Sequence, residues 1–156
     1  MSRLLCNNML NYLIWADQKI FVFIDQLKEK DLDFRIQPNG ISIRESLIHV
    51  AEDHWEWYQD LRKNHDGDIP NFREMNLKAL RDCIFQNNER WLEIFNSSPQ
   101  KSWKITRNGK NRTISIDEFV FHICNHASYH RGQLAMKLRL LGKEIPYLDY
   151  VPYRFD

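Results

Sequence analysis

The sequence predicts an all-α fold, a four-helix bundle with a short β-hairpin between the third and fourth helices. Apolar residues recur every three to four positions in four separate segments, as one buried face of an α-helix requires. Ser42 and Ser115 are each followed three residues later by a glutamate, a spacing typical of helix starts. Before the last helix the period changes to that of strands, on either side of Asn108-Gly109.

The first two helices are separated by a connection rich in turn-forming residues. Apolar spacing predicts the first helix from about residue 3 to about residue 28. The Pro-Asn-Gly sequence at 38–40 closes the connection, because these residues favour a turn. The second helix is expected to start after Ser42 and to extend to about residue 63.

The third helix is expected to end at Ser97-Ser98-Pro99, because proline cannot continue a helix. Strands at 103–107 and 111–115 then flank the Asn-Gly turn, whose two residues tolerate positive φ. The inward face of the third helix is predicted to consist of Leu77, Leu80, Ile84, Asn88, Trp91 and Phe95.

The fourth helix starts after Ser115, and Gly142 suits its C-terminal cap. The tail that leads to Asp156 is rich in aromatic residues, so we expect it to pack back on the bundle. The inward stripe of the helix is predicted to be Phe119, Ile123, Ala127, Leu134 and Leu141.

Length and charge narrow the class of protein. A chain of 156 residues can form a core without disulfides or structural metals, so one domain over 1–156 is expected. A bound metal would therefore serve function. The 22 Lys and Arg residues are balanced by 21 Asp and Glu residues, which argues against a nucleic-acid partner.

The three cysteines indicate a reducing compartment. Cys6, Cys83 and Cys124 are odd in number and widely spaced, and they form no CxxC motif. The N-terminal apolar stretch is too short and too polar for a signal peptide or a membrane span. We expect a cytoplasmic protein without a membrane partner.

His126 and His130 are the strongest candidates for metal ligands. Four residues apart on one helix, their imidazoles project from the same side and can chelate one ion. The alternative is two histidines at the edge of the core, held by ordinary hydrogen bonds. Ala127 follows the first histidine where zinc proteases of the HExxH type carry a catalytic glutamate, so that mechanism is excluded.

A catalytic metal site needs a third ligand from elsewhere in the chain. At roughly 100° per residue, His54 shares the apolar arc of the second helix, whereas His49 lies more than about 90° from its centre. Helical periodicity alone therefore favours His54. The candidates are His49, His54, His65 and His122.

The segment FHICNHASYHRGQLAMKLRLLGKEIPYLD resembles the last helix of the DinB family of metal-binding bundles, which includes YfiT-like proteins. The HxxxHRGQ core and the following Leu-Arg-x-x-Gly ending carry this resemblance. It extends to Tyr12 and Trp15 in the first helix, to SLIHVAEDHWEW in the second, and to the hairpin. It covers nearly the whole chain.

This resemblance implies that His49, His126 and His130 hold one divalent metal ion in the open end of the bundle, with water in the remaining positions. The metal would be zinc, nickel or iron. It also implies a homodimer and a small-molecule substrate, and some family members use the metal to activate a low-molecular-weight thiol for transfer or isomerisation.

We give the family motif precedence over periodicity in choosing His49. Ile48, Trp55 and Trp57 broaden the apolar arc of the second helix beyond one face, which suggests that this helix is covered on two sides. A dimer contact could supply the second cover.

Several neighbours of these histidines have more than one interpretation. His122 is a fourth ligand, a supporting partner or a core-edge residue, and the last two are favoured. Asp53 orients an imidazole or faces solvent. Gln133 supports the site or a neighbouring helix. Gly132 indicates close helix packing or backbone access.

Two further residues are assigned away from the site. Arg131 lies roughly 100° around the helix from His130, so it is interpreted as a structural ion-pair or dimer residue. Cys124 lies about 200° from His126, which excludes it as a ligand.

Three neutral imidazoles leave a divalent ion with its full charge, so its open positions favour hydroxide, a carboxylate or a thiolate. The sequence thus predicts a metal-dependent transferase or hydrolase, with a thiol-dependent S-transferase as one form. The alternatives are a non-catalytic metal-binding or stress-response protein and a helical interaction module.

Overall fold

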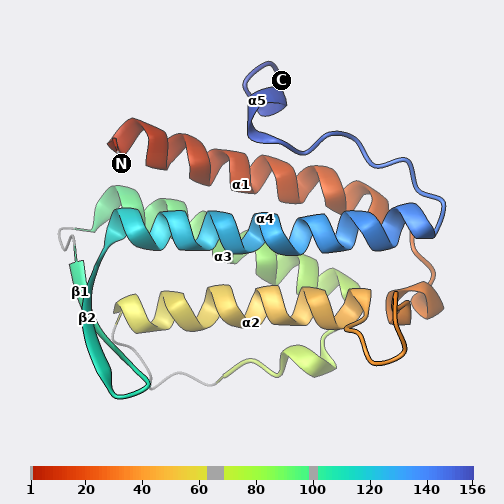
Figure 1. Ribbon diagram of the computed structural model, residues 1–156, viewed down its shortest axis with the longest axis horizontal. Helices are drawn as coiled ribbons and strands as arrows, with labels where there is room; N and C mark the ends of the chain where they lie inside the picture. The colour runs from red at the N-terminus through yellow and green to blue at the C-terminus, as the bar shows by residue number, and fades with distance from the viewer. Residues whose placement is uncertain (1, 63–68, 99–101) are drawn as a thin grey trace.

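The computed structural model describes residues 2–62, 69–98 and 102–156, and its four long helices and hairpin confirm the predicted fold class (Figure 1). Pro99 and His65 lie outside the described residues. The elements in chain order are α1 (Arg3–Ile24), η1 (Glu29–Asp33), α2 (Ile43–Arg62), η2 (Phe72–Glu74), α3 (Leu77–Ser97), β1 (Ser102–Arg107), β2 (Lys110–Ser115), α4 (Ile116–Leu140) and α5 (Tyr150–Tyr153).

The four long helices do not pack in the order of the chain. Helices α1 and α4 run in one direction and α2 and α3 in the other (Figure 1). Both α3 and α4 pack against α1 and against α2, so α1 and α2 lie diagonally opposite. The α2–α4 pair packs least closely of these four neighbouring pairs, which leaves room for polar side chains between them.

The first helix ends at Ile24, earlier than the predicted boundary near residue 28. The backbone N–H of Leu27 bonds to the carbonyl of Ile24, a tighter 3₁₀-type turn that closes the helix. Leu27 still packs against the core, so the apolar spacing continues after the helix has ended. Both predicted capping boxes are present, at Ser42 and at Ser115.

The hairpin forms as predicted and closes one end of the bundle. Asn108 and Gly109 have φ values of 52° and 70°, as a tight hairpin turn requires. Trp103 pairs with Ile114 across the strands, and its indole Nε1 donates to the carbonyl of Leu61 at 2.7 Å. This bond attaches the hairpin to the end of α2.

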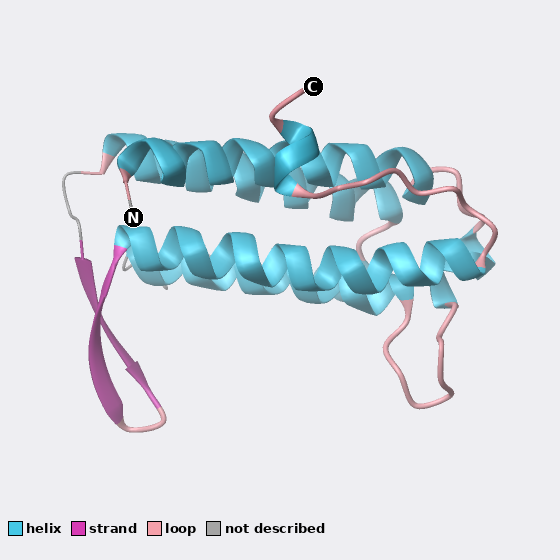
Figure 2. Cartoon of the chain, turned by 45° about the horizontal axis from the view of Figure 1, so that its top comes forward, coloured by secondary structure: helices cyan, strands magenta, loops and turns pink. Residues whose placement is uncertain are grey.

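The C-terminal segment packs along α1 and α4, as its aromatic content predicted (Figure 2). Tyr12 on α1 donates from its hydroxyl to the carbonyl of Leu148 at 2.8 Å, and its ring meets Tyr150 and Tyr153. The contact is partial, because the side chain of Phe155 is 87% exposed. None of the described helices has the length and apolar character needed to cross a membrane.

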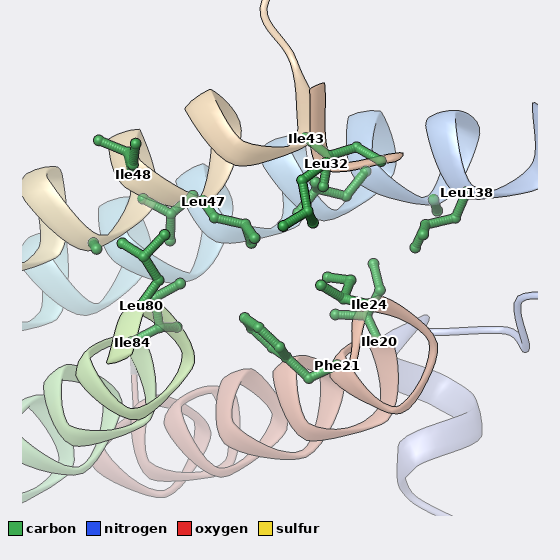
Figure 3. Close-up of a cluster of buried hydrophobic side chains, with 14 of the residues drawn as sticks. Ile20, Phe21, Ile24, Leu32, Ile43, Leu47, Ile48, Leu80, Ile84 and Leu138 are labelled. Carbon is green, nitrogen blue, oxygen red and sulfur yellow. The ribbon is translucent and has the colours of Figure 1, made fainter. Parts of the chain in front are cut away.

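The apolar core is divided into two clusters along the bundle. One lies toward the end that carries η1 (Figure 3), and the other lies toward the hairpin. The first includes Ile20, Ile24, Leu47, Leu80, Ile84 and Leu138. The second includes Leu10, Leu13, Trp91, Phe95, Phe119 and Ile123.

A layer of buried polar residues separates the two clusters, and every long helix contributes to it. In each long helix, buried polar positions fall between the residues assigned to one cluster and those assigned to the other, whereas Ser46 and Lys137 are buried among the residues of the cluster toward η1. The polar layer comprises Asp17 of α1, His54 of α2, Asn87 and Asn88 of α3, and His130 and Arg131 of α4.

An ion pair between α1 and α4 anchors the polar layer. Nη1 of Arg131 donates to Oδ1 of Asp17 at 2.8 Å, and Asn88 donates to the other carboxylate oxygen at 2.7 Å. Arg131 also bonds to Ser128 and lies over the ring of Tyr12. These contacts compensate the burial of both charges, and they confirm Arg131 as a structural ion-pair residue.

We expect Asp17→Leu to lower the free energy of unfolding by about 3–5 kcal/mol, because it leaves the buried Arg131 guanidinium unpaired. The double variant Asp17→Leu/Arg131→Met should lose clearly less. Urea unfolding measures both. Lys78→Met, which breaks an exposed pair with Asp82, is the control and should change stability little. Equal losses in the single and double variants would contradict this account.

Candidate metal centre

Three imidazoles from two helices converge between α2 and α4. The ring centre of His49 lies 5.2 Å from that of His126 and 4.7 Å from that of His130. Nε2 of His126 and Nε2 of His130 are 3.1 Å apart, as their spacing on α4 predicted. One ring nitrogen from each of the three residues lies within 4.8 Å of the others. The expected location in the open end of the bundle is wrong, because both α4 histidines lie midway along that helix.

The exposure of the three histidines follows from the phase of their helices. Val50 and Ala51 face the core, which leaves His49 on the exposed edge of α2. On α4, Ala127 and Arg131 point inward, so His130 is buried and His126 is half-buried beside α2. The group is therefore open to solvent on the His49 side and closed on the α4 side.

The second cover of α2 is supplied by the chain itself. Trp55 packs its ring on Phe72 of η2, with ring centres 6.2 Å apart. Trp57 packs on Phe119 of α4, at 5.6 Å. The prediction of an apolar arc wider than one core face is confirmed. Neither tryptophan requires a dimer contact to explain its burial.

The three nitrogens fit one divalent ion. Imidazole nitrogens lie about 2.1 Å from zinc, so two nitrogens on one ion are at most about 4.2 Å apart. The 3.1 Å between His126 and His130 is within this span. One nitrogen of His49 lies within 4.8 Å of those of the other two residues, and the exposed position of its ring leaves space for the adjustment that coordination requires.

The imidazoles of His126 and His130 are neutral at physiological pH. Burial, together with the neighbouring His126 and His49, lowers the pKa of His130 to about 4. Burial also lowers the pKa of His126, although Asp53 opposes this shift. Metals bind the neutral form of imidazole, so these two residues need lose no proton to accept an ion.

Two polar side chains support the α4 histidines from behind. Oδ2 of Asp53 is 3.3 Å from Nδ1 of His126, a close polar contact without the alignment of a hydrogen bond. Asp53 therefore faces an imidazole, as one of its two readings expected. Gln133 approaches His130, where its contact favours the protonated ring. Nδ1 of neither imidazole has an aligned hydrogen-bond partner among the described residues.

His54 lies inside the core and outside the convergent group. Its side chain is 0% exposed, and its ring centre is 6.2 Å from that of His126. Trp91 donates to its backbone carbonyl at 3.3 Å, which ties α3 to α2 at this point. Periodicity identified the most buried histidine, whereas a ligand that leaves open positions must lie at the edge of the core.

The remaining candidates are placed around the group. His122 is exposed, stacks on His126 with ring centres 5.8 Å apart, and is not among the three convergent residues. Cys124 faces α1, where its Sγ contacts the carbonyl of Met9 at 3.4 Å, which confirms its exclusion. A Cβ on Gly132 would meet nothing within 4 Å, so close helix packing among the described residues does not explain this glycine.

A pocket of about 460 Å³ adjoins the histidines, with His49 and His130 in its wall. It also contains Glu52 and Arg73, which the sequence analysis did not single out. Glu52 follows His49 by nearly one helical turn, so its position could have been found from spacing. Arg73 lies in η2, outside any amphipathic pattern, so no feature of the sequence indicated its place in the pocket.

Buried His54 should make the protein less stable in acid. Burial lowers its pKa to about 3 from an ordinary value near 6.5, so between these values the unfolded chain binds more protons. The free energy of unfolding should therefore fall as the pH falls, by up to about 1.4 kcal/mol per pH unit from this residue. His54→Leu should flatten this dependence in urea unfolding with a chelator present. An unchanged slope would contradict the assignment.

Comparisons with known proteins agree with this architecture. The model of the DinB family matches residues 1–155. Protein DinB of Bacillus subtilis (strain 168) is 24% identical over 155 residues, which cover 92% of this chain and 90% of that protein. The structure of YfiT from Bacillus subtilis, described as a probable metal-dependent hydrolase with an unusual four-helix bundle topology, superimposes with a TM-score of 0.74 at 12% identity, over 92% of this chain and 91% of YfiT. The chain belongs to the DinB family.

Proposed function

We propose that the protein is a metal-dependent enzyme in which His49, His126 and His130 hold one divalent ion that activates water or a low-molecular-weight thiol. The observation that carries this proposal is the convergence of three imidazoles from two helices at the wall of a pocket. A purely structural role would need no such pocket beside the group.

The chemistry follows from the charge of the ligand set. Three neutral imidazoles leave the double charge of a bound ion uncompensated, which lowers the pKa of a water or thiol bound to it. The chain supplies the other requirements. Burial keeps His126 and His130 unprotonated, Asp53 faces the back of His126, and the pocket gives a substrate access from the His49 side.

Hydrolysis and thiol-dependent S-transfer would use this site in the same way, since each needs an anionic nucleophile at the ion. The likeness to YfiT supports hydrolysis, and the DinB resemblance supports thiol transfer. Imidazole ligands suit zinc, nickel and iron, so the ion is one of these.

We also propose that the protein acts as a homodimer in the cytoplasm. Exposed apolar side chains continue along one side of α4, including Phe121, Met136 and Leu140, and a second copy could cover them. All three cysteines are free, which suits a reducing compartment.

Removing a ligand should remove the metal. His126→Ala and His49→Ala are expected to lose stoichiometric zinc, nickel or iron in elemental analysis of the untagged protein, because two imidazoles hold an ion far less tightly than three. The matched control is His122→Ala, which removes an exposed imidazole on α4 outside the group and should retain the metal. Full metal occupancy in His126→Ala would contradict the proposed ligand set. Hydrolase or transferase activity that survives complete removal of the metal by a chelator would contradict the proposed function.

Asp53→Asn should weaken metal binding by roughly 10- to 100-fold, because Asp53 faces the ring nitrogen of His126 opposite the ligand side. Competition titration against a chromophoric chelator measures the Kd. Glu56→Gln, which removes an exposed carboxylate from the same helix, is the control and should leave the Kd unchanged. Equal affinities in Asp53→Asn and the wild type would show that Asp53 does not position the ligand.

A further inference from the structure

The pocket beside the histidines is formed where α2, α4 and η2 meet (Figure 1, the short yellow-green turn below α2). His49 and His130 form the part of its wall that belongs to the metal centre. Ile48 and the ring of Tyr129 supply apolar surface close to them. Its volume of about 460 Å³ is typical of pockets that take small organic molecules.

One of the two acidic residues in the pocket is already neutralised. Glu45 pairs with Arg35 through both carboxylate oxygens, and one of them also accepts from the backbone N–H of Ser42 at 2.7 Å. The pairing with Arg35 and the bond from Ser42 lower the pKa of Glu45 to about 2. Glu45 therefore adds little net charge to the pocket.

Arg73 is the cation in the lining of this pocket, and no described residue pairs with it. It extends from η2, which packs against α2, the helix that carries His49. A guanidinium without a partner binds carboxylates through two parallel hydrogen bonds. The other charged group without a described partner is Glu52, on α2 near His49.

We propose that this pocket binds a small organic molecule whose non-reacting end carries a carboxylate held by Arg73, while its reacting end lies at the three histidines. The inference rests on the proposed function, because it places the reacting end at the metal. Ile48 and Tyr129 contact the carbon chain between the two ends. Glu52 repels a second negative group beside the ligands, so the pocket selects molecules with one carboxylate.

The test uses thiols as probes, because a thiolate that binds cobalt changes the visible absorption of a cobalt-substituted protein. Mercaptoalkanoic acids of increasing chain length are titrated against their primary amides, which have the same shape without the charge. The wild type should bind the best acid roughly three- to tenfold more tightly than its amide, as expected for a partly exposed charge pair. The acid and its amide differ in thiol pKa, but this difference is the same for every variant, so it cancels when the acid-to-amide affinity ratio of one variant is compared with that of another.

Two substitutions should move this preference in opposite directions. Arg73→Gln should remove the preference for the acid and leave the affinity for the amide unchanged. Glu52→Gln should increase the preference, because it removes a negative charge from the same pocket. The control is Arg112→Gln, which removes an exposed cation from the hairpin and should leave both affinities unchanged.

The outcomes separate this inference from the proposed function. Equal preference for the acid in the wild type and in Arg73→Gln would overturn the role of Arg73, as would no preference in the wild type at any chain length. Either result would leave the metal centre in place. Failure of the protein to bind cobalt would overturn both, since the proposed function already requires an ion at the three histidines.

Discussion

The ion pair between Asp17 and Arg131 is the contact on which the geometry of the centre depends. Arg131 must reach α1 to meet Asp17, and this fixes the rotation of α4 about its axis. His130 precedes Arg131 by one residue, a rotation of roughly 100°, so it turns away from α1 toward α2. The fold therefore uses a buried charge to orient the neighbouring imidazole, and His126 follows because it lies one helical turn earlier on the same side.

The chain order of the bundle explains why the site lies between α2 and α4. Helices α1 and α4 share many apolar contacts, as do α2 and α3, and these two close pairs carry much of the core. The α2–α4 seam is looser, and midway along the bundle it includes part of the polar layer that separates the two apolar clusters. Polar side chains at this seam displace fewer apolar contacts than they would elsewhere in the bundle. An open site therefore costs less folding free energy here than between α1 and α4.

Local sequence rules predicted much of the fold. They failed where the position of a side chain depends on tertiary packing. The capping boxes and the Asn108-Gly109 turn depend on nearby backbone groups, so residue type and spacing identified them. The HxxxH pair was found for the same reason. Choosing between His49 and His54 required knowing which edge of α2 faces α4, which periodicity cannot give. Arg73 was missed because η2 is placed by the packing of Phe72 on Trp55, a contact distant in sequence.

The burial that positions the histidines also makes the ion and the fold interdependent. Without an ion, His126 and His130 hold two ring nitrogens 3.1 Å apart, and burial has already removed the option of protonating them near neutral pH. An ion bound there replaces this contact with two favourable bonds and displaces no proton from either ring. Because the unfolded chain lacks the arrangement, binding stabilises the folded state by mass action. Two neutral imidazoles at this distance can share one hydrogen bond, which the bound ion would replace. The Asp17–Arg131 pair keeps α4 in the rotation that holds both ring nitrogens at the site.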